Sequence, residues 1–518
     1  MQEHLKKIMI PVADGSTHEL VIPEEVDYGR MEAYARGQAA TVRADLQRGV
    51  DRNSGLIEGL RSTCEQQAHR IGAQEESLAR LHHELVVKPR LIARLVAIGY
   101  GDEEADVVVS PLSMEEAVAK VALREGLASI GYTPTETEEC LEDVPALTQE
   151  DIDYARGLME AHDPATTALT KTWLGDTRMV VFPKIDTSNV KSISQAWGGC
   201  SNLRYIPLID TSNVVTAALP FYDGTSARCP LRRLPAFDFS SLTGGNGGMT
   251  GFLPELEILP HLDYPKCTHF LSNFKQDYKL SEIDFSFIDT ATFDQTFTGT
   301  AITKPVITDF KASTSINTLY ANCPNLDPDF SAYTFKSSAP KVNLGGLFFQ
   351  TKVSAMPRLE FNDVSALSSF FEWNTVVPTV IPDMSMWGNV TTVNGFLHGV
   401  ISTNAPERIE GLDFASVSDA TNFLWSYNRF PKLRFIRILN LGKGSCATYD
   451  FSDARCWGED TPDHPDARKS LVDTLLTDSH DRAAAGLPPA TIRLYSTVRN
   501  RLTAEELAAI TAKGFTLS

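Results

Sequence analysis

Cysteine is scarce in this chain, and long apolar runs are absent. Only 8 of the 518 residues are cysteine, and they are scattered, which argues against a disulfide framework or a zinc ribbon. Cys446, Cys456 and His464 match the spacing of no standard metal-ligand set. No run reaches the length of a membrane span, and residues 1–11 lack the apolar core and cleavage site of a secretory signal. We therefore expect no metal, no cofactor and no membrane insertion.

Positive charge is also in short supply. The formal net charge is -19 at pH 7, so the average surface repels nucleic acid and anionic membranes. Arg232 with Arg233, and the segment 432–437, are the best candidates for a local basic patch, although solvated side chains are the simpler interpretation. We expect no nucleic-acid partner.

The common catalytic motifs are missing as well. The chain contains no Gly-x-x-x-x-Gly-Lys-Ser/Thr, no Gly-x-Ser-x-Gly and no His-Glu-x-x-His. A glycosidase needs two carboxyl groups about 5–10 Å apart, and several acid pairs are compatible with that spacing. The aspartates recur in register, however, which a turn role predicts and a single active site does not. We assign no catalytic, cofactor-binding or metal residue and predict that the protein is not an enzyme.

A repeated phrase dominates the middle of the chain. Residues 182–190 read Phe-Pro-Lys-Ile-Asp-Thr-Ser-Asn-Val, and residues 206–214 repeat most of it 24 residues later. The Pro-x-x-Asp step recurs with its aspartates at positions 186, 210, 238 and 263. Farther on, Val364, Val390 and Val417 each precede a phenylalanine by six residues. A fixed period of this size is typical of a solenoid, and we predict about eleven units of 24–28 residues between residues 179 and 456.

The repeated residues have structural roles. Asp, Ser and Asn side chains bond to the backbone one or two residues away and so favour turns. A calcium ladder is the alternative role for the aspartates, but Lys or Gly stands where a second carboxylate would be needed. Cys200 and Cys323 share a position three residues after an aromatic residue, where we predict small buried side chains.

These residues resemble the BspA-like leucine-rich-repeat family, whose copies carry the Asp-Thr-Ser-Asn-Val phrase followed by an aromatic residue, Gly-Cys and Leu. The match is tight over residues 182–214, looser afterwards, and covers about half of the chain. The family occurs in surface and adhesion proteins of gut and oral bacteria, including Bacteroides-type hosts, and in proteins of their phages. The resemblance implies an α/β repeat solenoid that serves as a binding scaffold.

The segment before the repeats predicts a helical stem. Residues 1–30 have the pattern of a small β element for attachment, and residues 31–87 form a proline-free heptad pattern typical of a coiled coil. Polar residues at core positions favour a parallel homotrimer over a dimer; a helix packed on its own chain is the alternative. The predicted seam consists of Leu46, Val50, Ile57, Leu60, Cys64, Ile71, Leu78, Leu81 and Leu85.

Caps are expected at both ends of the solenoid, because its end turns would otherwise expose their apolar interior. Residues 88–178 are predicted to form a helical connector and N-terminal cap, with helices over 114–130 and 149–161. Residues 457–518 predict a C-terminal cap in the order helix, strand, helix, strand, including a helix over 503–513 capped by Thr503.

Aromatic residues near the predicted turns are the best candidates for receptor contacts, although core packing is the alternative role for each. They are Tyr222, Phe371, Trp373, Trp387, Trp425 and Tyr427.

Taken with the resemblance and the missing export signal, the pattern favours a phage fibre or tail structural protein. It would assemble into the virion in the host cytoplasm, attach to other virion proteins through its N-terminal region, and bind a host surface protein or glycan with its solenoid. A bacterial cell-surface adhesin is the first alternative, and a glycan-degrading tail spike the second.

Overall fold

The structure is a computed structural model that describes residues 5–11, 17–23, 37, 54–110, 113–243, 248–400, 406–426 and 430–518. The chain divides into two compact units, Met1–Val121 and Ala122–Ser518. The boundary falls inside one helix, α5 (Met114–Ser129). No helix among the described residues is long and apolar enough to cross a membrane.

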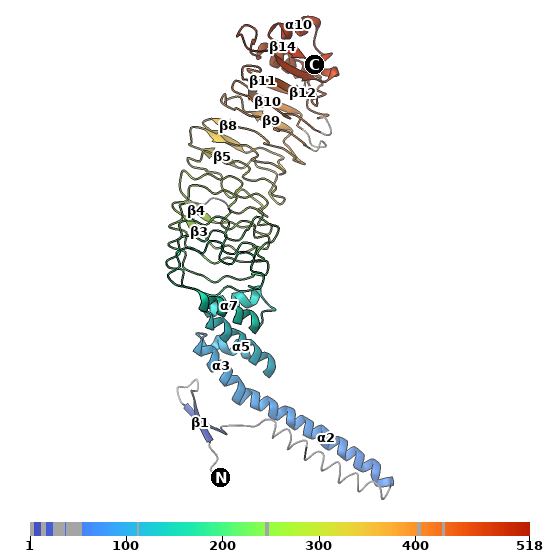
Figure 1. Cartoon of the computed structure of the whole chain (residues 1–518). Coiled ribbons are helices and arrows are strands. Elements are labelled where there is room, and N and C mark those ends of the chain that lie inside the picture. The colour runs from blue at the N-terminus through green and yellow to red at the C-terminus, as the bar shows by residue number, and fades with distance from the viewer. Residues whose placement is uncertain are drawn as a thin grey trace. The chain divides into compact units, whose positions relative to one another are not determined.

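The first unit contains a hairpin and a series of helices (Figure 1). Strands β1 (Leu5–Pro11) and β2 (Thr17–Pro23) pair antiparallel. Helix α2 (Ser54–His82) continues through a π-helical turn, η1 (His83–Val87), into α3 (Lys88–Ala97), which is followed by α4 (Asp102–Val109). A small core joins α3, α4 and the start of α5; its buried residues are Leu91, Leu95, Tyr100, Ala105, Val109, Ala117 and Val121.

The predicted coiled-coil seam lies partly on α2. Leu46 and Val50 are outside the described residues, and for Ile57, Leu60 and Leu85 only the backbone is described. Cys64 and Ile71 are half-buried. Leu78 and Leu81 are 52% and 54% exposed, so a single chain leaves this end of the seam uncovered.

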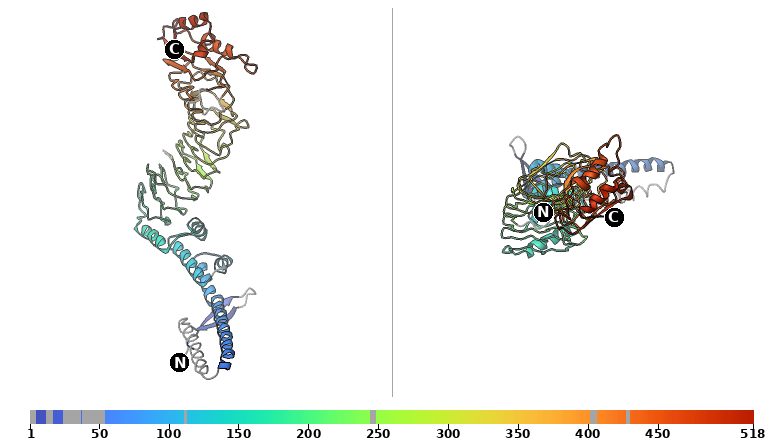
Figure 2. Two further views of the ribbon diagram at one scale, coloured as in Figure 1. Left: turned by 90° about the vertical axis from the view of Figure 1, so that its right-hand side faces the viewer. Right: turned by 90° about the horizontal axis from the view of Figure 1, so that it is seen from above.

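The second unit is a β-solenoid of about ten turns at a spacing of about 25 residues (Figures 1 and 2). Successive turns pair in parallel, first through single bridges such as Val181 with Tyr205 and then through short strands. The paired strands are β3 (Leu262–Tyr264) with β4 (Phe285–Phe287), β5 (Thr334–Ser337) with β7 (Arg358–Phe361), β6 (Val342–Asn343) with β8 (Val364–Ala366), and β10 (Arg408–Asp413) between β9 (Val380–Asp383) and β11 (Phe435–Leu439).

The structure corrects the predicted α/β solenoid in two respects. It has about ten turns rather than about eleven, and the described residues between 162 and 466 contain no helix. The turns contain a tight backbone arc in place of a helix. In most turns the arc is a five-residue segment whose first and fifth residues have positive φ. These turn arcs are 171–175, 195–199, 248–252, 272–276, 295–299, 318–322, 346–350, 369–373 and 395–399.

Alternate residues of each turn arc donate to the next turn. Ser369 N–H donates to the Asn394 carbonyl at 2.7 Å, Phe371 N–H to Phe396 at 2.9 Å and Trp373 N–H to His398 at 2.8 Å. The ladder satisfies buried backbone donors without a regular strand or helix. It also holds non-glycine residues in the left-handed region, which they rarely adopt by themselves.

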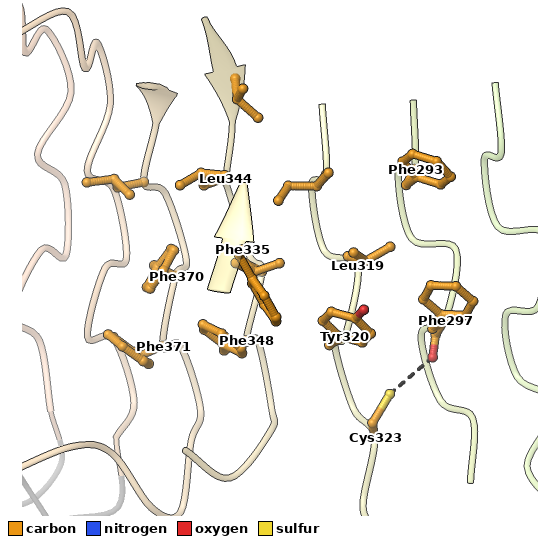
Figure 3. Close-up of a cluster of buried hydrophobic side chains, with 14 of the residues drawn as sticks. Phe293, Phe297, Leu319, Tyr320, Cys323, Phe335, Leu344, Phe348, Phe370 and Phe371 are labelled. Atoms are coloured by element: carbon orange, nitrogen blue, oxygen red, sulfur yellow. Dashed lines mark hydrogen bonds between the residues drawn. The ribbon is translucent and has the colours of Figure 1, made fainter. Parts of the chain in front are cut away.

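Aromatic rings at the third position of the turn arcs point inward and stack from turn to turn (Figure 3). Phe297 and Tyr320 lie 5.7 Å apart between ring centroids, and Phe348 and Phe371 lie 6.0 Å apart. Cys323, which lies three residues after the inward ring of Tyr320, is 1% exposed, and its Sγ donates to the Phe297 carbonyl at 3.1 Å. Burial raises the pKa of this thiol to about 11.

Cys200 has the same position and the same kind of contact, with Sγ donating to the Trp173 carbonyl at 3.0 Å. It is fully buried. The prediction that Cys200 and Cys323 are small buried side chains is therefore confirmed.

Three of the four repeated aspartates, Asp186, Asp210 and Asp238, close turns as predicted, whereas Asp263 lies in β3 and accepts from Ser286 Oγ of the next turn. The carboxylates of Asp186 and Asp210 accept the N–H groups of Ser188 and Ser212, each at 3.0 Å. Asn213 of the same phrase donates its amide to the Ser188 carbonyl of the preceding turn at 2.9 Å. The phrase therefore both shapes a bend and ties two turns together.

The N-terminal end of the solenoid packs against the last part of α5, α6 (Pro134–Asp143) and α7 (Gln149–Ala161). Leu127, Tyr132 and Ile152 form a buried cluster with Val181 and Tyr205 of the first turns. The expected helices over 114–130 and 149–161 are present. Thr148 caps α7 by accepting from Asp151 N–H at 3.3 Å.

The C-terminal end carries the expected order of helix, strand, helix and strand, with one additional short helix after the first strand. In chain order its elements are α8 (Ala467–Val472), the π-helical turn η3 (Asp473–Thr477), β13 (Ala490–Leu494), α9 (Ser496–Arg499), α10 (Ala504–Ala512) and β14 (Phe515–Leu517). Strand β13 pairs in parallel between β12 (Thr448–Phe451) and β14. Leu471, Leu475 and Phe515 are buried in the same core as the solenoid interior, so this end is closed.

Candidate binding surface on the turn arcs

The fourth and fifth residues of the turn arcs stack along one side of the solenoid. Their ladder contacts fix the backbone, so each such residue has a near equivalent one turn away. Most of these positions hold glycine or polar residues, and the rings among them are Phe252, Phe349, Trp373 and His398. Two side-chain groups form around Phe252 and around Trp373. We call them the proximal cluster (Tyr222, Phe252, Arg228 and Lys275) and the distal ring column (Trp373, His398 and Trp425).

The side chains of the proximal cluster contact one another. Tyr222 and Phe252 stack with ring centroids 4.2 Å apart, and the Arg228 guanidinium lies 4.3 Å from the Tyr222 ring centre. Phe252 is 8% exposed and Tyr222 is half-buried. Burial lowers the pKa of Lys275, whose ammonium lies 6.0 Å from the Phe252 ring centre. The predicted contact residue Tyr222 thus already has an aromatic and a cationic neighbour within its own chain.

The distal ring column has one ring from each of three consecutive turns. The ring centroids of Trp373 and His398 are 5.2 Å apart, and those of His398 and Trp425 are 4.8 Å apart. Glu372 Oε1 lies 2.7 Å from His398 Nδ1 and fixes the imidazole between the two indoles. Trp425 is 37% exposed, the largest fraction among the six tryptophans, all of which the structure describes.

A glycine makes room for this column. Gly399 has φ +69°, and a Cβ built there would lie 2.6 Å from the Trp373 ring. The indole therefore rests on the backbone of the following turn. Any side chain at residue 399 would displace the ring as well as strain the backbone.

Polar groups border the Trp425 end of the column. A small hollow beside the Trp425 indole is lined by Asn422, Leu424, Asp450, Ser452 and Asp453. Asp450 Oδ1 accepts from Ser452 N–H at 3.0 Å, and Asp453 Oδ2 accepts from Ser426 N–H at 2.8 Å. These turn contacts hold two carboxylates next to an exposed ring.

Two of the other predicted contact residues belong to the core. Trp387 is 1% exposed and its Nε1 donates to the Phe361 carbonyl at 3.2 Å. Phe371 is an inward ring with no exposed surface. The prediction of Trp387 and Phe371 as surface contacts is wrong. The sequence pattern does not distinguish inward from outward positions, because both accept aromatic residues. Tyr427 lies outside the described residues.

Ion pairs occupy the first candidate basic patch and part of the second. Arg233 pairs with the buried carboxylate of Asp143 at 2.6 Å, and Arg232 pairs with Glu142 at 2.7 Å. At the second candidate segment, Arg437 pairs with Asp478 at 3.2 Å.

The candidate metal residues have ordinary roles. Cys446 Sγ donates to the Thr448 carbonyl at 3.1 Å, and Cys456 Sγ donates to the Pro431 carbonyl at 3.0 Å. His464 Nε2 lies 3.3 Å from Glu407 Oε2. Within the described ranges, no three or more His, Cys, Asp or Glu residues are grouped to hold a metal ion.

Two larger grooves lie elsewhere on the second unit. One, of ≈ 510 Å³, runs between α6 and the first turns and combines exposed Leu208 and Ile258 with Glu136 and Lys184, which pair at 3.0 Å. The other, of ≈ 460 Å³, has an ion-paired lining, in which Asp309 lies 3.2 Å from Lys336. The aromatic residue that lines these grooves, Tyr205, is 2% exposed, whereas Trp425 of the distal ring column is 37% exposed. We therefore take the distal ring column as the candidate binding surface.

Comparisons of the chain with protein-family models, with curated proteins and with solved structures find no match.

Proposed function

We propose that this chain is a phage fibre or tail protein of the virion, which presents its solenoid for binding to a receptor on the host surface. The observation that carries the proposal is the distal ring column: an exposed indole in an ordered row of rings on a rigid, repetitive scaffold. Tryptophan is enriched among residues that dominate binding energy, because it offers a large surface with little conformational freedom to lose.

The resemblance of residues 182–214 to BspA-like repeats supports the same proposal. That family occurs in adhesion proteins, which bind cell surfaces, and in phage proteins. In our proposal residues 1–30 attach to other virion proteins, 31–87 form the stem, 88–178 connect, 179–456 bind and 457–518 close the solenoid.

The stem of the proposed fibre is a parallel homotrimer. Leu78 and Leu81 leave more than half of their side-chain surface in water. Burying a leucine contributes about 1.5–3 kcal/mol, so association along this face is favourable. Trimerisation would also present three copies of the binding surface, which raises avidity at a cell surface without any new contact.

Two measurements test the proposed function. Fluorescently labelled full-length protein is applied to a panel of gut and oral bacteria, and we expect binding to a subset of strains. Phage particles from cultures that produce the protein are then labelled with gold-conjugated antibody, and we expect gold on a tail or fibre. Binding to no strain would contradict the receptor role. Surface labelling of cells without labelled particles would instead identify a bacterial adhesin.

A further inference from the structure

We propose that the distal ring column binds an uncharged polysaccharide, with a hexose ring stacked on Trp425 and its hydroxyl groups bonded to the neighbouring carboxylates. This inference rests on the proposed function, because it names the class of receptor that the binding surface takes. It assigns the contact to the end of the column rather than to its whole length.

The stacking surface is the exposed indole. Trp425 is 37% exposed, whereas His398 and Glu372 have side chains 21% and 15% exposed and are engaged with each other. The C–H-bearing face of a pyranose is apolar and slightly positive at hydrogen, so it complements the negative face of an aromatic ring. The other rings of the column hold the indole in place, which reduces the entropy lost on binding.

The hydroxyl acceptors lie beside that face. Asp450 and Asp453 line the hollow next to Trp425, together with Asn422. Asp450 receives Ser452 N–H and Oγ–H on one oxygen, and Arg493 lies 3.4 Å from the other. A carboxylate offers about four lone-pair sites, so Asp450 has capacity for a ligand hydroxyl. Hydrogen bonds to a charged acceptor are stronger than neutral ones.

Charge selects against the acidic class of polysaccharide. Glu372, Asp450 and Asp453 are all acidic, and the whole chain carries a formal charge of -19. A uronic-acid or sialic-acid polymer would be repelled both locally and by the average field. An uncharged chain keeps the hydroxyl donors and avoids that repulsion.

The test uses the full-length protein and defined probes. Gluco-, galacto- and manno-hexaoses and a hyaluronan hexasaccharide are titrated while tryptophan fluorescence and calorimetric heat are followed. We expect at least one neutral hexaose to bind and hyaluronan not to bind. Trp425→Ala should weaken the binding about tenfold, which corresponds to about 1.4 kcal/mol.

Tyr278→Ala is the matched control, because Tyr278 is an aromatic residue with 54% exposure that belongs to neither ring group. It should bind as the unaltered protein does, and both variants should show the unfolding temperature of the parent. Binding to none of the neutral probes, stronger binding to hyaluronan, or unchanged binding by Trp425→Ala would overturn the inference.

The same variants in the bacterial panel separate this inference from the proposed function. Cells that bind the protein while all neutral hexaoses fail would overturn the polysaccharide assignment and leave the receptor role standing. Failure to bind any cell would contradict the receptor role itself.

Discussion

Single residues in the solenoid interior decide how its stability responds to pH. Asp277 is fully buried; its Oδ1 accepts from Leu253 N–H at 2.9 Å, and its Oδ2 has no hydrogen-bond partner among the described residues. Burial raises the pKa of this carboxyl well above its usual value. Asn374 makes the same contact with Thr351 N–H at 2.9 Å in a later turn, so the position needs an acceptor and not a charge.

We predict that Asp277→Asn stabilises the protein at pH 7 by about 2 kcal/mol. Above about pH 4 the carboxyl is ionised in the unfolded chain but protonated in the folded one, so the stability of the parent falls as pH rises toward the folded-state pKa. The free energy of unfolding, measured with urea between pH 4 and 8, should decline with this slope in the parent, and the slope should be lost in the variant. The exposed Asp463, changed to Asn, is the control and should keep the slope.

The contact between the Trp373 indole and the backbone of residue 399 can be tested by substituting Gly399. We predict that Gly399→Ala destabilises the solenoid by about 2 kcal/mol more than Gly175→Ala. Both glycines have positive φ, +69° and +74°, so both variants share the backbone strain, but a Cβ at residue 175 meets nothing within 4 Å. Near-ultraviolet circular dichroism should change for Gly399→Ala alone. Equal losses in the two variants would mean that the indole does not rest on residue 399.

Among the elements, α6 contacts the solenoid through ion pairs as well as through the buried apolar cluster. The Asp143 side chain is 1% exposed and lies 2.6 Å from Arg233 and 3.1 Å from Arg232. Removing one partner of a buried pair leaves an uncompensated charge, which costs about 3–5 kcal/mol.

We therefore predict that Asp143→Ala lowers the free energy of unfolding by about 3 kcal/mol. Glu142→Ala is the matched control, because Glu142 reaches the same arginines from a side chain that is 59% exposed. An exposed pair contributes about 1 kcal/mol or less. Chemical denaturation measures both. A loss in Asp143→Ala no larger than in Glu142→Ala would mean that α6 is not held by this buried pair.

The elements also differ in how far the sequence predicts them. Helix α7 and its Thr148 cap were predictable because capping is local. The turn arcs were not, because residues such as Gln295 and Trp373 have no preference for positive φ and adopt it only when the neighbouring turn's carbonyls hold them. The same limit applies to the candidate site. Trp373 and Trp425 were predicted, but His398 and Glu372, 26 positions apart, become partners only through stacking.

For the whole molecule, oligomeric state is the quantity to measure. We predict that the full-length chain has the mass of a trimer in solution and that the double variant Leu78→Glu with Leu81→Glu is a monomer, because charge at these exposed seam positions opposes association. Val107→Glu is the control: Val107 is 72% exposed but lies on α4. Multi-angle light scattering after gel filtration reads the mass directly. A monomeric parent would contradict the stem.

The turn-to-turn ladder has a further consequence for how such a protein changes length. The arc N–H groups that bond outside their own turn donate to the next turn, so an inserted or deleted turn of about 25 residues finds the same partners on both sides and leaves the cross-section unaltered. The reach of the binding surface can then vary in whole steps while Trp425 and its neighbours keep their geometry. Duplication and loss of turns would therefore be a ready way to reposition one contact site on surfaces of different depth.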